Sequence, residues 1–272
     1  MKKSKILIVS DMCGYGKVAA AAQMPIFSYM GHDVFTLPTM LISNTFPYGK
    51  YAILESTGYI SEALQKWNEL GFHFDAITTG FMASERQAQI VAQYCREQAA
   101  LGTAIYVDPV MGDYGKLYGG ADEGTIRCMR EMLGVAHLCF PNYTEACLLT
   151  NVKYKDEGMT VTEAKELVNK VRRIGSMSVI ITSCVVDGVH SVIGYNHFSG
   201  KYFQLTYEEI PVQFPGTGDI FSSIIVGCLQ DGDTLEHATQ YAMDILHNWI
   251  FQNKDNEDKN RGIPIERHLN EL

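Results

Sequence analysis

The sequence predicts an α/β protein whose mostly parallel sheet is covered by helices on both faces. Short, continuous apolar runs such as KILIVS at 5–10 are typical of strands that are buried on both sides. Segments with helical spacing alternate with these runs almost without interruption, which favours parallel strands joined by helices. Because no Pro/Gly/Ser-rich linker divides the 272 residues, we expect a single domain over 1–272.

The first half of the chain accounts for four of the expected strands. They lie at 5–10, 33–41, 74–80 and 103–110. Helices are expected between them, up to Tyr29, from Ser56 or Thr57 to about Leu70, and over 84–101. Gly31 is the type of residue that closes a helix, and a polar loop at 43–50 follows the second strand.

The second half begins with a Gly- and Asp-rich loop at 112–124, which leads into a helix. Further strands are expected at 136–140 and 178–183, each next to a helix, and an antiparallel pair at 188–195 and 200–207. Two helices follow, at 217–231 and 234–252, before the charged segment NKDNEDKNRG.

Composition excludes several classes of protein. Apolar residues make up 46% of the chain and charged residues 19%, and the net charge of −9 argues against a nucleic-acid partner. The apolar run after the N-terminal lysines ends at Asp11, which favours a first strand over a signal peptide. No run approaches the ~20 residues of a membrane span, so we expect no membrane partner.

The cysteines and histidines indicate neither a disulfide framework nor a transition-metal site. Seven cysteines are scattered, odd in number and never in a CxxC pair, and the eight histidines show no HExxH spacing. This usage fits reduced thiols in a cytoplasmic protein.

Polar residues follow the predicted strands. In a parallel α/β sheet the ligand binds beyond the carboxyl ends of the strands. The residues found there are Ser10, Thr39, Gly80, Asp108, Asn142 and Thr182.

The stretch FPGTGDIFSS at 214–223 predicts an anion site at a helix start. Gly216, Thr217 and Gly218 form a tight turn, and apolar residues follow at helical spacing. The free N–H groups and the positive dipole end of such a helix attract phosphate. Asp219 places a carboxylate at the same position, so it needs a separate role.

Three other stretches keep alternative interpretations. DMCGYGKVAA at 11–20 lacks the first glycine and the Ser/Thr of a P-loop and also fails GxGxxG, which leaves a flexible turn under a substrate or a plain strand-to-helix turn. Asp108 and Pro109 could form an ordinary turn. Asn142 and Glu145 could form a capping box, or could meet a phosphate and the water around Mg²⁺.

The order of these motifs resembles the ribokinase-like superfamily and, within it, the vitamin B6 kinases. DPVMGD, PNYTEACLLT, ITS and GTGDIF occur in the family's order, and the match covers nearly the whole chain. LPTMLISNT resembles the second strand and following loop of these enzymes, and SDMCGYGK resembles the N-terminal turn of a bacterial subgroup. The resemblance implies a three-layer sandwich.

It also implies transfer of a phosphoryl group from ATP, with Mg²⁺, to the 5′-hydroxymethyl group of pyridoxal, pyridoxine or pyridoxamine. Asp219 would be the base, and Gly216, Thr217 and Gly218 would form the anion hole. Because Asp219 lies in the first turn of a helix, we expect the helix to lower its pKa and keep it ionised.

The other implied roles follow the motifs. The residues expected near ATP are Asp113, Asn142, Glu145, Thr182 and Ser183. Asp108 and Glu145 are expected near Mg²⁺, through water. Ser10, Thr39 and Phe81 are expected at the pyridine ring, with a core position as the alternative for Phe81. A homodimer is implied as well.

Departures from the family pattern concern the substrate pocket and the nucleotide loop. Asp11 replaces a frequent His, Phe140 replaces a Thr, and Asn44-Thr45 replaces an Asn-His pair. A hydroxymethylpyrimidine (phosphate) kinase of thiamine synthesis is the nearest alternative, although its Gly-Gly-Ala-Gly run is missing. A sugar kinase, a non-catalytic B6-binding protein and a Rossmann dehydrogenase fit the motifs less well.

Overall fold

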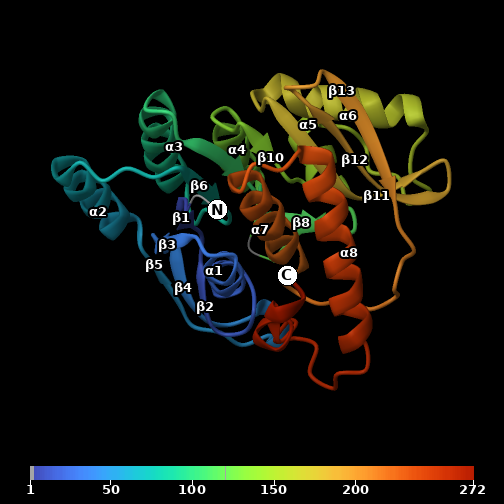
Figure 1. Cartoon of the computed structure of the whole chain (residues 1–272), viewed down its shortest axis with the longest axis horizontal. Coiled ribbons are helices and arrows are strands. Elements are labelled where there is room, and N and C mark those ends of the chain that lie inside the picture. Colours follow the sequence, from blue (N-terminus) through green and yellow to red (C-terminus); the bar gives the residue numbers. More distant parts are fainter. Residues whose placement is uncertain (1–2, 120) are drawn as a thin grey trace. The chain divides into compact units, whose positions relative to one another are not determined.

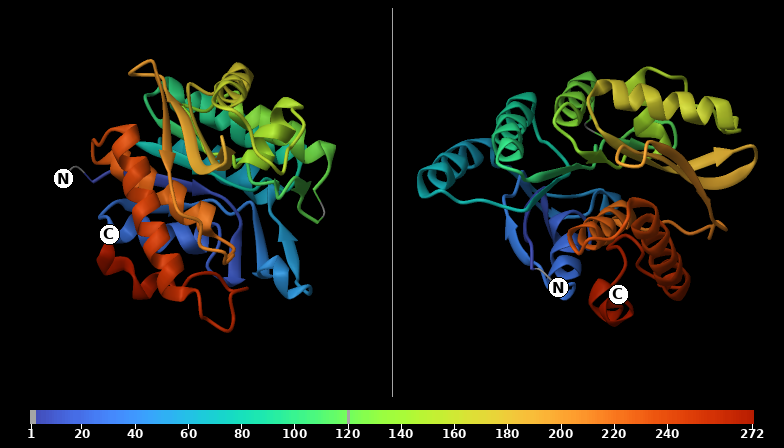
Figure 2. Two further views of the ribbon diagram at one scale, coloured as in Figure 1. Left: turned by 90° about the vertical axis from the view of Figure 1, so that its right-hand side faces the viewer. Right: turned by 45° about the horizontal axis from the view of Figure 1, so that its top comes forward.

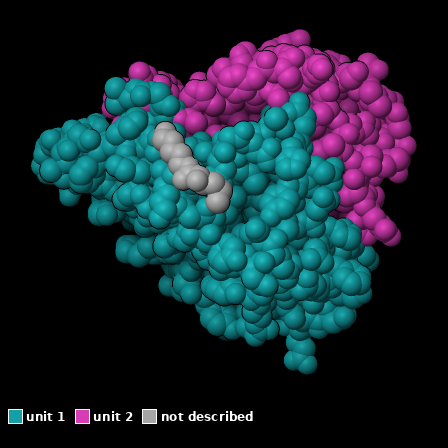
Figure 3. Space-filling model, viewed as in Figure 1, with its two compact units in different colours: residues 1–80, 101–103, 210–272 teal, residues 81–100, 104–209 magenta. Residues whose placement is uncertain are grey.

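The computed structural model describes residues 3–119 and 121–272 and contains two compact units (Figure 3). Unit 1 comprises Met1–Gly80, Leu101–Thr103 and Ile210–Leu272, and unit 2 comprises Phe81–Ala100 and Ala104–Glu209. The single domain expected from the sequence stays a prediction.

Unit 1 contains three parallel strands of the main sheet, in the order β6-β1-β3. They are β1 (Lys5–Val9), β3 (Asp33–Thr36) and β6 (Ala76–Thr79). From Ile6 to Val9 every side chain of β1 is fully buried, as its continuous apolar run predicts. The strands therefore form the core of this unit.

The described part of unit 1 has four helices. They are α1 (Ala20–Tyr29), α2 (Thr57–Leu70), α7 (Thr217–Gln230) and α8 (Leu235–Asn253). Helix α1 packs on β1 and β3, and α7 packs between α1 and α8 (Figure 1). Three short 3₁₀ turns complete the unit: η1 (Phe46–Tyr48), η2 (Ile265–Arg267) and η3 (Leu269–Glu271).

A second, small sheet in unit 1 was missed by sequence reasoning. It contains β2 (Met12–Tyr15), β4 (Met40–Asn44) and β5 (Ile53–Glu55). The strand expected at 33–41 is split into β3 and β4 around Pro38, because proline lacks the N–H that a strand interior needs. Residues 40–44 consequently leave the main sheet and pair with β2 and β5.

Unit 2 contributes five strands, in the order β7-β10-β11-β12-β13. They are β7 (Ala104–Val107), β10 (Leu138–Cys139), β11 (Ser178–Val186), β12 (Val189–Asn196) and β13 (Lys201–Thr206). The first three are parallel, and the antiparallel arrangement of β12 and β13 confirms the pair expected near 188–207.

The helices of unit 2 form a row in which each packs on the next (Figure 2). They are α3 (Glu85–Ala100), α4 (Glu123–Leu133), α5 (Tyr143–Thr150) and α6 (Val161–Ile174). With helices packed on a mostly parallel sheet, the predicted α/β class is confirmed.

The seven cysteines are all buried as free thiols and belong to the packed interior. Among the described residues, no helix combines the length with the hydrophobicity needed to cross a bilayer.

Candidate functional site

The glycine turn, residues 214–219, opens helix α7 in unit 1. Gly216 has φ 87°, a left-handed conformation that favours glycine. A Cβ at this position would overlap the carbonyl oxygen of Lys17, so glycine is needed for space as well. Helix α7 starts at Thr217, and no side-chain hydrogen bond caps its first turn. A helix start of this kind offers backbone N–H groups that have no partner inside the helix.

Asp219 is fixed by a residue from a distant part of the chain. The backbone N–H of Ala19 donates to its Oδ2 at 2.7 Å. Ala19 has φ 50°, a conformation that alanine rarely adopts. The carboxylate is therefore positioned by the turn that precedes α1.

The expectation of a lowered pKa for Asp219 is wrong. Desolvation raises the pKa of Asp219 to about 7, and the neighbouring charge of Asp11 adds to the rise, while the Ala19 N–H opposes it. Withdrawal of the carboxylate from water thus outweighs the stabilisation that a helix N-terminus offers an anion.

Asp11 brings a second carboxylate to the same part of unit 1. It comes two residues after β1 ends, is 9% exposed, and its carbonyl accepts from the N–H of Ala20 at 3.1 Å. Burial raises the pKa of Asp11 to about 6, although a hydrogen bond with the Ser10 side chain lowers it. Sequence reasoning noted Asp11 only as a departure; an acid that directly follows a buried strand was the available signal.

Ser10 and Thr39 lie side by side in unit 1. The N–H of Thr39 donates to the carbonyl of Ser10 at 3.0 Å, and both residues are buried. The Ser10 hydroxyl rests against Gly80, where a Cβ would overlap it. Unit 1 therefore brings together Ser10, Thr39, Asp11 and Asp219 with its glycine turn.

A short hairpin in unit 2 carries Asp113. It consists of β8 (Gly112–Asp113) and β9 (Lys116–Leu117), joined by Tyr114 and Gly115. Both joining residues have positive φ, 50° and 74°, as a type I′ turn requires. The Asn142 side chain donates to the carbonyl of Gly112 at 2.8 Å, which attaches the hairpin to the start of α5.

Asn142 and Glu145 form the capping box that their spacing allows. Asn142 Oδ1 accepts from the N–H of Glu145, and Glu145 Oε2 accepts from the N–H of Asn142, both at 2.9 Å. Glu145 Oε1 also accepts from the N–H of Met111 at 3.0 Å. Burial raises the pKa of Glu145, and the charge of Asp113 adds to the rise. The expected contacts of Asn142 and Glu145 with phosphate and with the water around Mg²⁺ stay a prediction.

Thr182 joins the same group. Its N–H donates to the carbonyl of Pro141 at 3.0 Å, and it forms a parallel bridge with Asn142. Ser183 follows at a bulge in β11 with φ 56°. Hydrogen bonds, the bridge and the Asp113–Glu145 charge interaction thus bring Asp113, Asn142, Glu145 and Thr182 together.

Asp108 and Phe81 belong to unit 2 as well. Asp108 follows Val107, which pairs with Cys139, so Asp108 and Asn142 come after neighbouring strands at the same edge. Asp108 is buried, whereas Phe81 is partly exposed. A fully buried core position for Phe81 is therefore not what the structure shows.

The oxygen donors of unit 2 suit Mg²⁺ that is bound largely through water. The described residues contain no cluster of three His, Cys, Asp or Glu side chains that could enclose a metal ion. Mg²⁺ commonly keeps several waters and uses one or two carboxylates together with substrate phosphates. Asp108 and Glu145 fit that pattern and not an all-protein cage.

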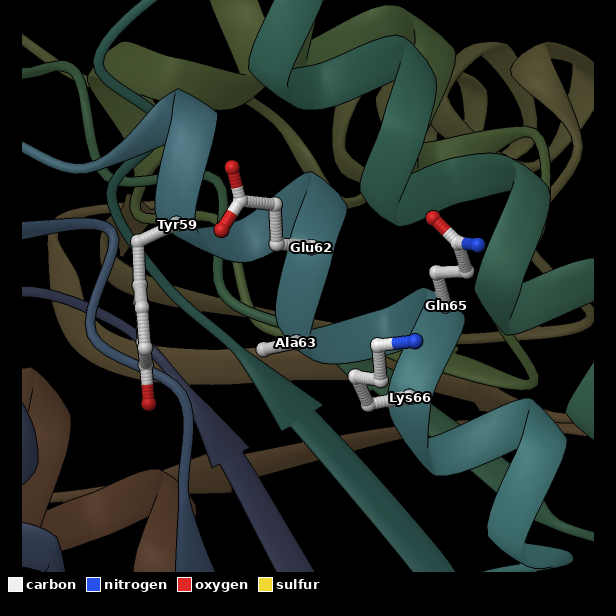
Figure 4. Close-up of a pocket in the computed structure, with 5 residues that line it drawn as sticks. All are labelled: Tyr59, Glu62, Ala63, Gln65 and Lys66. Carbon is white, nitrogen blue, oxygen red and sulfur yellow. The ribbon is translucent and has the colours of Figure 1, made fainter.

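Two surface hollows lie elsewhere. One is an open depression along α2, lined by Tyr59, Glu62, Ala63, Gln65 and Lys66 (Figure 4). The other lies between α5 and α6 in unit 2 and includes Tyr143 and Lys153. Neither is lined by a predicted site residue, so each unit's candidate residues are defined by their own group of side chains instead.

A glycine turn with an adjacent aspartate on a mostly parallel sheet is the arrangement of a small-molecule kinase of the ribokinase-like class. The chain belongs to the phosphomethylpyrimidine kinase family, whose model matches residues 44–263. The kinase class expected from the motifs is confirmed.

Relatives support the resemblance to vitamin B6 kinases. Pyridoxal kinase of Dictyostelium discoideum is 24% identical, over 96% of this chain and 89% of its own. A Bacteroides thetaiotaomicron structure with pyridoxal, provisionally named a phosphomethylpyrimidine kinase, is 36% identical with TM-score 0.93, over 99% and 96% of the two chains. Pyridoxal kinase from Lactobacillus plantarum is 25% identical with TM-score 0.89, over 99% and 96%. The motif-based recognition is confirmed.

Substitution of Asp11 by Asn is expected to stabilise the fold, increasingly as pH rises. A carboxyl whose pKa is raised in the folded protein favours folding below pH 3.8, which is its pKa in the unfolded chain. This contribution is lost as pH rises through about 6, which is its pKa in the folded protein. Asp11→Asn should therefore gain about 1–3 kcal/mol over the original protein at pH 7.5 and almost nothing at pH 4.

Urea unfolding at both pH values measures this difference, with the exposed Asp231→Asn as the control. An advantage of Asp11→Asn that is equal at the two pH values would contradict the assignment.

Proposed function

We propose that this protein phosphorylates the 5′-hydroxymethyl group of pyridoxal, pyridoxine or pyridoxamine with ATP. One observation carries the proposal: this chain has the glycine turn with Asp219, and it matches its relatives over nearly its whole length. Several of these relatives are pyridoxal kinases. A relative crystallised with pyridoxal supports the same class of substrate.

Asp219 is the proposed base. Phosphoryl transfer passes through a loose transition state, in which the alcohol needs positioning more than early loss of its proton. A carboxyl with a pKa of about 7 can hold the hydroxyl as an acceptor and take its proton near neutral pH. The Ala19 N–H orients the carboxylate for this task.

The glycine turn is the proposed anion hole. The N–H groups of Gly216, Thr217 and Gly218 are candidates to stabilise charge on the transferring phosphoryl group, because a helix start offers N–H groups without internal partners. The carboxylate of Asp219 and the phosphate then have separate partners: Asp219 faces the alcohol, and the backbone faces the anion.

The residues of unit 2 are the proposed ATP and magnesium group. We assign Asp113, Asn142, Glu145, Thr182 and Ser183 to ATP. Asp108 and Glu145 would hold Mg²⁺ through water. When bound, Mg²⁺ would neutralise phosphate charge. A cation near Glu145 would also favour the ionised form of this buried carboxyl.

Ser10, Thr39 and Phe81 are the proposed contacts of the pyridine ring. The first two are held together by a backbone hydrogen bond, and Phe81 retains exposed surface for stacking. Asp11 beside Ser10 gives this pocket a carboxylate, which is the feature that could set the preference among the three vitamers.

A hydroxymethylpyrimidine (phosphate) kinase is the second candidate, because the matching family carries that description. The missing Gly-Gly-Ala-Gly run in the N-terminal turn is evidence against it. The relatives that carry the name pyridoxal kinase favour vitamin B6.

Consumption of ATP by the purified protein with Mg²⁺ tests the proposal. Pyridoxal, pyridoxine, pyridoxamine and hydroxymethylpyrimidine are compared at equal concentration, with and without EDTA. We expect turnover with at least one B6 vitamer, and its loss with EDTA. Turnover on the pyrimidine alone would assign the second function, and no turnover on any of the four would contradict both.

Asp219→Asn is expected to reduce kcat by roughly 100-fold or more, because the base is lost while the glycine turn remains. Binding of ATP and pyridoxal, measured by calorimetry, should change little. Asp231→Asn at the other end of α7 serves as the matched control and should keep its turnover. Near-normal kcat in Asp219→Asn would refute the assignment of the base.

We also propose a cytoplasmic homodimer. The seven buried free thiols suit a reducing compartment. In the small sheet, Leu41 and Leu54 are cross-strand partners, and they are 44% and 63% exposed. Ile53 and Tyr51 add exposed apolar surface nearby, so this face is a candidate contact for a second copy.

Leu54→Glu should convert the dimer into a monomer, because a charge would be buried in the apolar contact. Light scattering after size-exclusion chromatography measures the mass. Leu101→Glu, at a leucine that is 67% exposed, should leave the dimer intact. A monomeric unsubstituted protein, or a dimer that persists in Leu54→Glu, would rule out this contact.

A further inference from the structure

The charged segment after α8, residues 254–264, has a defined path in unit 1, and we call it the C-terminal loop. The N–H of Asn256 donates to the carbonyl of Asn253 at 2.9 Å, and the N–H of Gly262 donates to the carbonyl of Lys259 at 3.0 Å. Ile263 is fully buried. A segment so rich in charged residues is thus fixed by its own backbone and by one apolar anchor.

The C-terminal loop contacts the turn that precedes α1. The N–H of Lys17 donates to the carbonyl of Arg261 at 2.7 Å. The ammonium group of Lys17 also pairs with the carboxylate of Glu266 in η2. Lys17, which a P-loop would direct at phosphate, is therefore bound at both its backbone and its side chain by the end of the chain.

The loop also contacts the glycine turn. A Cβ at Gly262 would lie 2.8 Å from the carbonyl oxygen of Lys17 and 3.0 Å from that of Pro215. Gly262 has φ 84°, so its conformation also favours glycine. Only a residue without a side chain allows the three backbone segments to approach this closely.

Two side chains hold the loop from its other side. Thr45 Oγ1 donates to the carbonyl of Asn260, and the Tyr48 hydroxyl donates to Asp258 Oδ2, both at 2.6 Å. The loop is therefore fixed between the region of the small sheet and the Lys17 turn.

These contacts end close to the reacting carboxylate. Lys17 lies two residues before Ala19, whose N–H holds Asp219 at 2.7 Å. Ala19 keeps a positive φ of 50°, which is strained for alanine and persists only where the surroundings impose it. Met12, which bridges Ala19, and the carbonyl of Asp11, which accepts from the N–H of Ala20, hold this backbone from one direction. The Lys17 backbone, which the C-terminal loop fixes, holds it from the other.

We propose that the C-terminal loop positions the base: through Lys17 it fixes the Ala19 N–H that holds Asp219, and Gly262 and Glu266 are the positioning residues. The proposal rests on the proposed function for the role of Asp219. The chemistry itself stays with Asp219, and the loop acts only through the backbone of residues 17–19.

Loosening the loop should change catalysis in a specific way. Without the Ala19 N–H, the carboxylate loses a donor that favours its ionised form, so the acid limb of the pH–kcat profile should move to higher pH. Among the described residues, Asp11 is a charged group that acts on Asp219, and Asp11 also acts on Cys13; neither Asp11 nor Cys13 is altered by the variants below. The KM for ATP should stay constant.

The first test compares Gly262→Ala with Gly31→Ala. Both glycines have similar positive φ, 84° and 89°, but no atom lies within 4 Å of a Cβ built at Gly31. Both substitutions therefore introduce similar backbone strain, but only the methyl group added in Gly262→Ala would overlap atoms of the Lys17 turn. Amide hydrogen exchange should accelerate at 14–20 and 214–219 in Gly262→Ala only, and kcat should fall by roughly ten-fold or more.

The second test is the milder Glu266→Gln, which decides the question if Gly262→Ala fails to fold. Since the pair is partly exposed, its loss should leave the melting temperature nearly unchanged. We expect kcat to fall by about two- to five-fold, with the acid limb shifted upward. Unchanged kcat and an unchanged pH profile would overturn the proposal, as would unchanged exchange in folded Gly262→Ala.

The proposed function can fail separately. If the unsubstituted protein phosphorylates no B6 vitamer, the proposed function is contradicted. The amide hydrogen exchange of Gly262→Ala, compared with that of Gly31→Ala, then decides alone whether the loop holds the Ala19 turn. If the unsubstituted protein is active and all variants match it, the positioning role is contradicted while the function stands.

Discussion

Carboxylates that are held by backbone N–H groups organise the candidate residues of each unit. In unit 1, Asp219 is held by Ala19, and in unit 2, Glu145 is held by Asn142 and Met111. A buried carboxylate is costly unless donors meet it, so each one fixes the backbone that supplies its donors. Ala19, with its positive φ, and Met111, just before β8, are the residues whose backbone supplies these donors.

The same requirement explains why the two carboxyls have raised pKa values. Backbone N–H groups offset part of the desolvation cost, but they do not neutralise the charge as a cation would. Both groups therefore suit the roles that we propose for them: Asp219 would accept the proton of an alcohol, and Glu145 would lie near magnesium. Inference from a helix dipole alone misjudged Asp219, because it left burial out.

Local patterns predicted most of the main sheet and its helices. Apolar runs located the strands of both units, and the spacing of Asn142 and Glu145 correctly allowed a capping box. The small sheet was missed because its short strands are half exposed and lack a continuous apolar run. Pro38 marked the break between β3 and β4, yet residues 40 and 41 were still read as the end of one long strand.

Long-range contacts limited what could be predicted of the site. The motif GTGD and the polar strand ends predicted the site residues, and within each unit the structure brings several of them together. That Ala19 holds Asp219, or that residues 254–264 reach Lys17, depends on pairs separated by about 200 residues or more, which no local spacing encodes. Gly262 illustrates this. In the sequence it ends a charged segment, and only the fold shows that the carbonyl groups of Lys17 and Pro215 lie close to it.

The buried cysteines have a consequence for how this protein responds to its surroundings. Burial raises the pKa of Cys95 and Cys139 to about 12, and that of Cys13, beside the turn before α1, to about 11. At neutral pH almost none of these thiols is the thiolate that reacts with oxidants or alkylating agents. Oxidative damage at these thiols is therefore gated by opening of the structure, and the rate at which the thiols react becomes a measure of how often the fold opens.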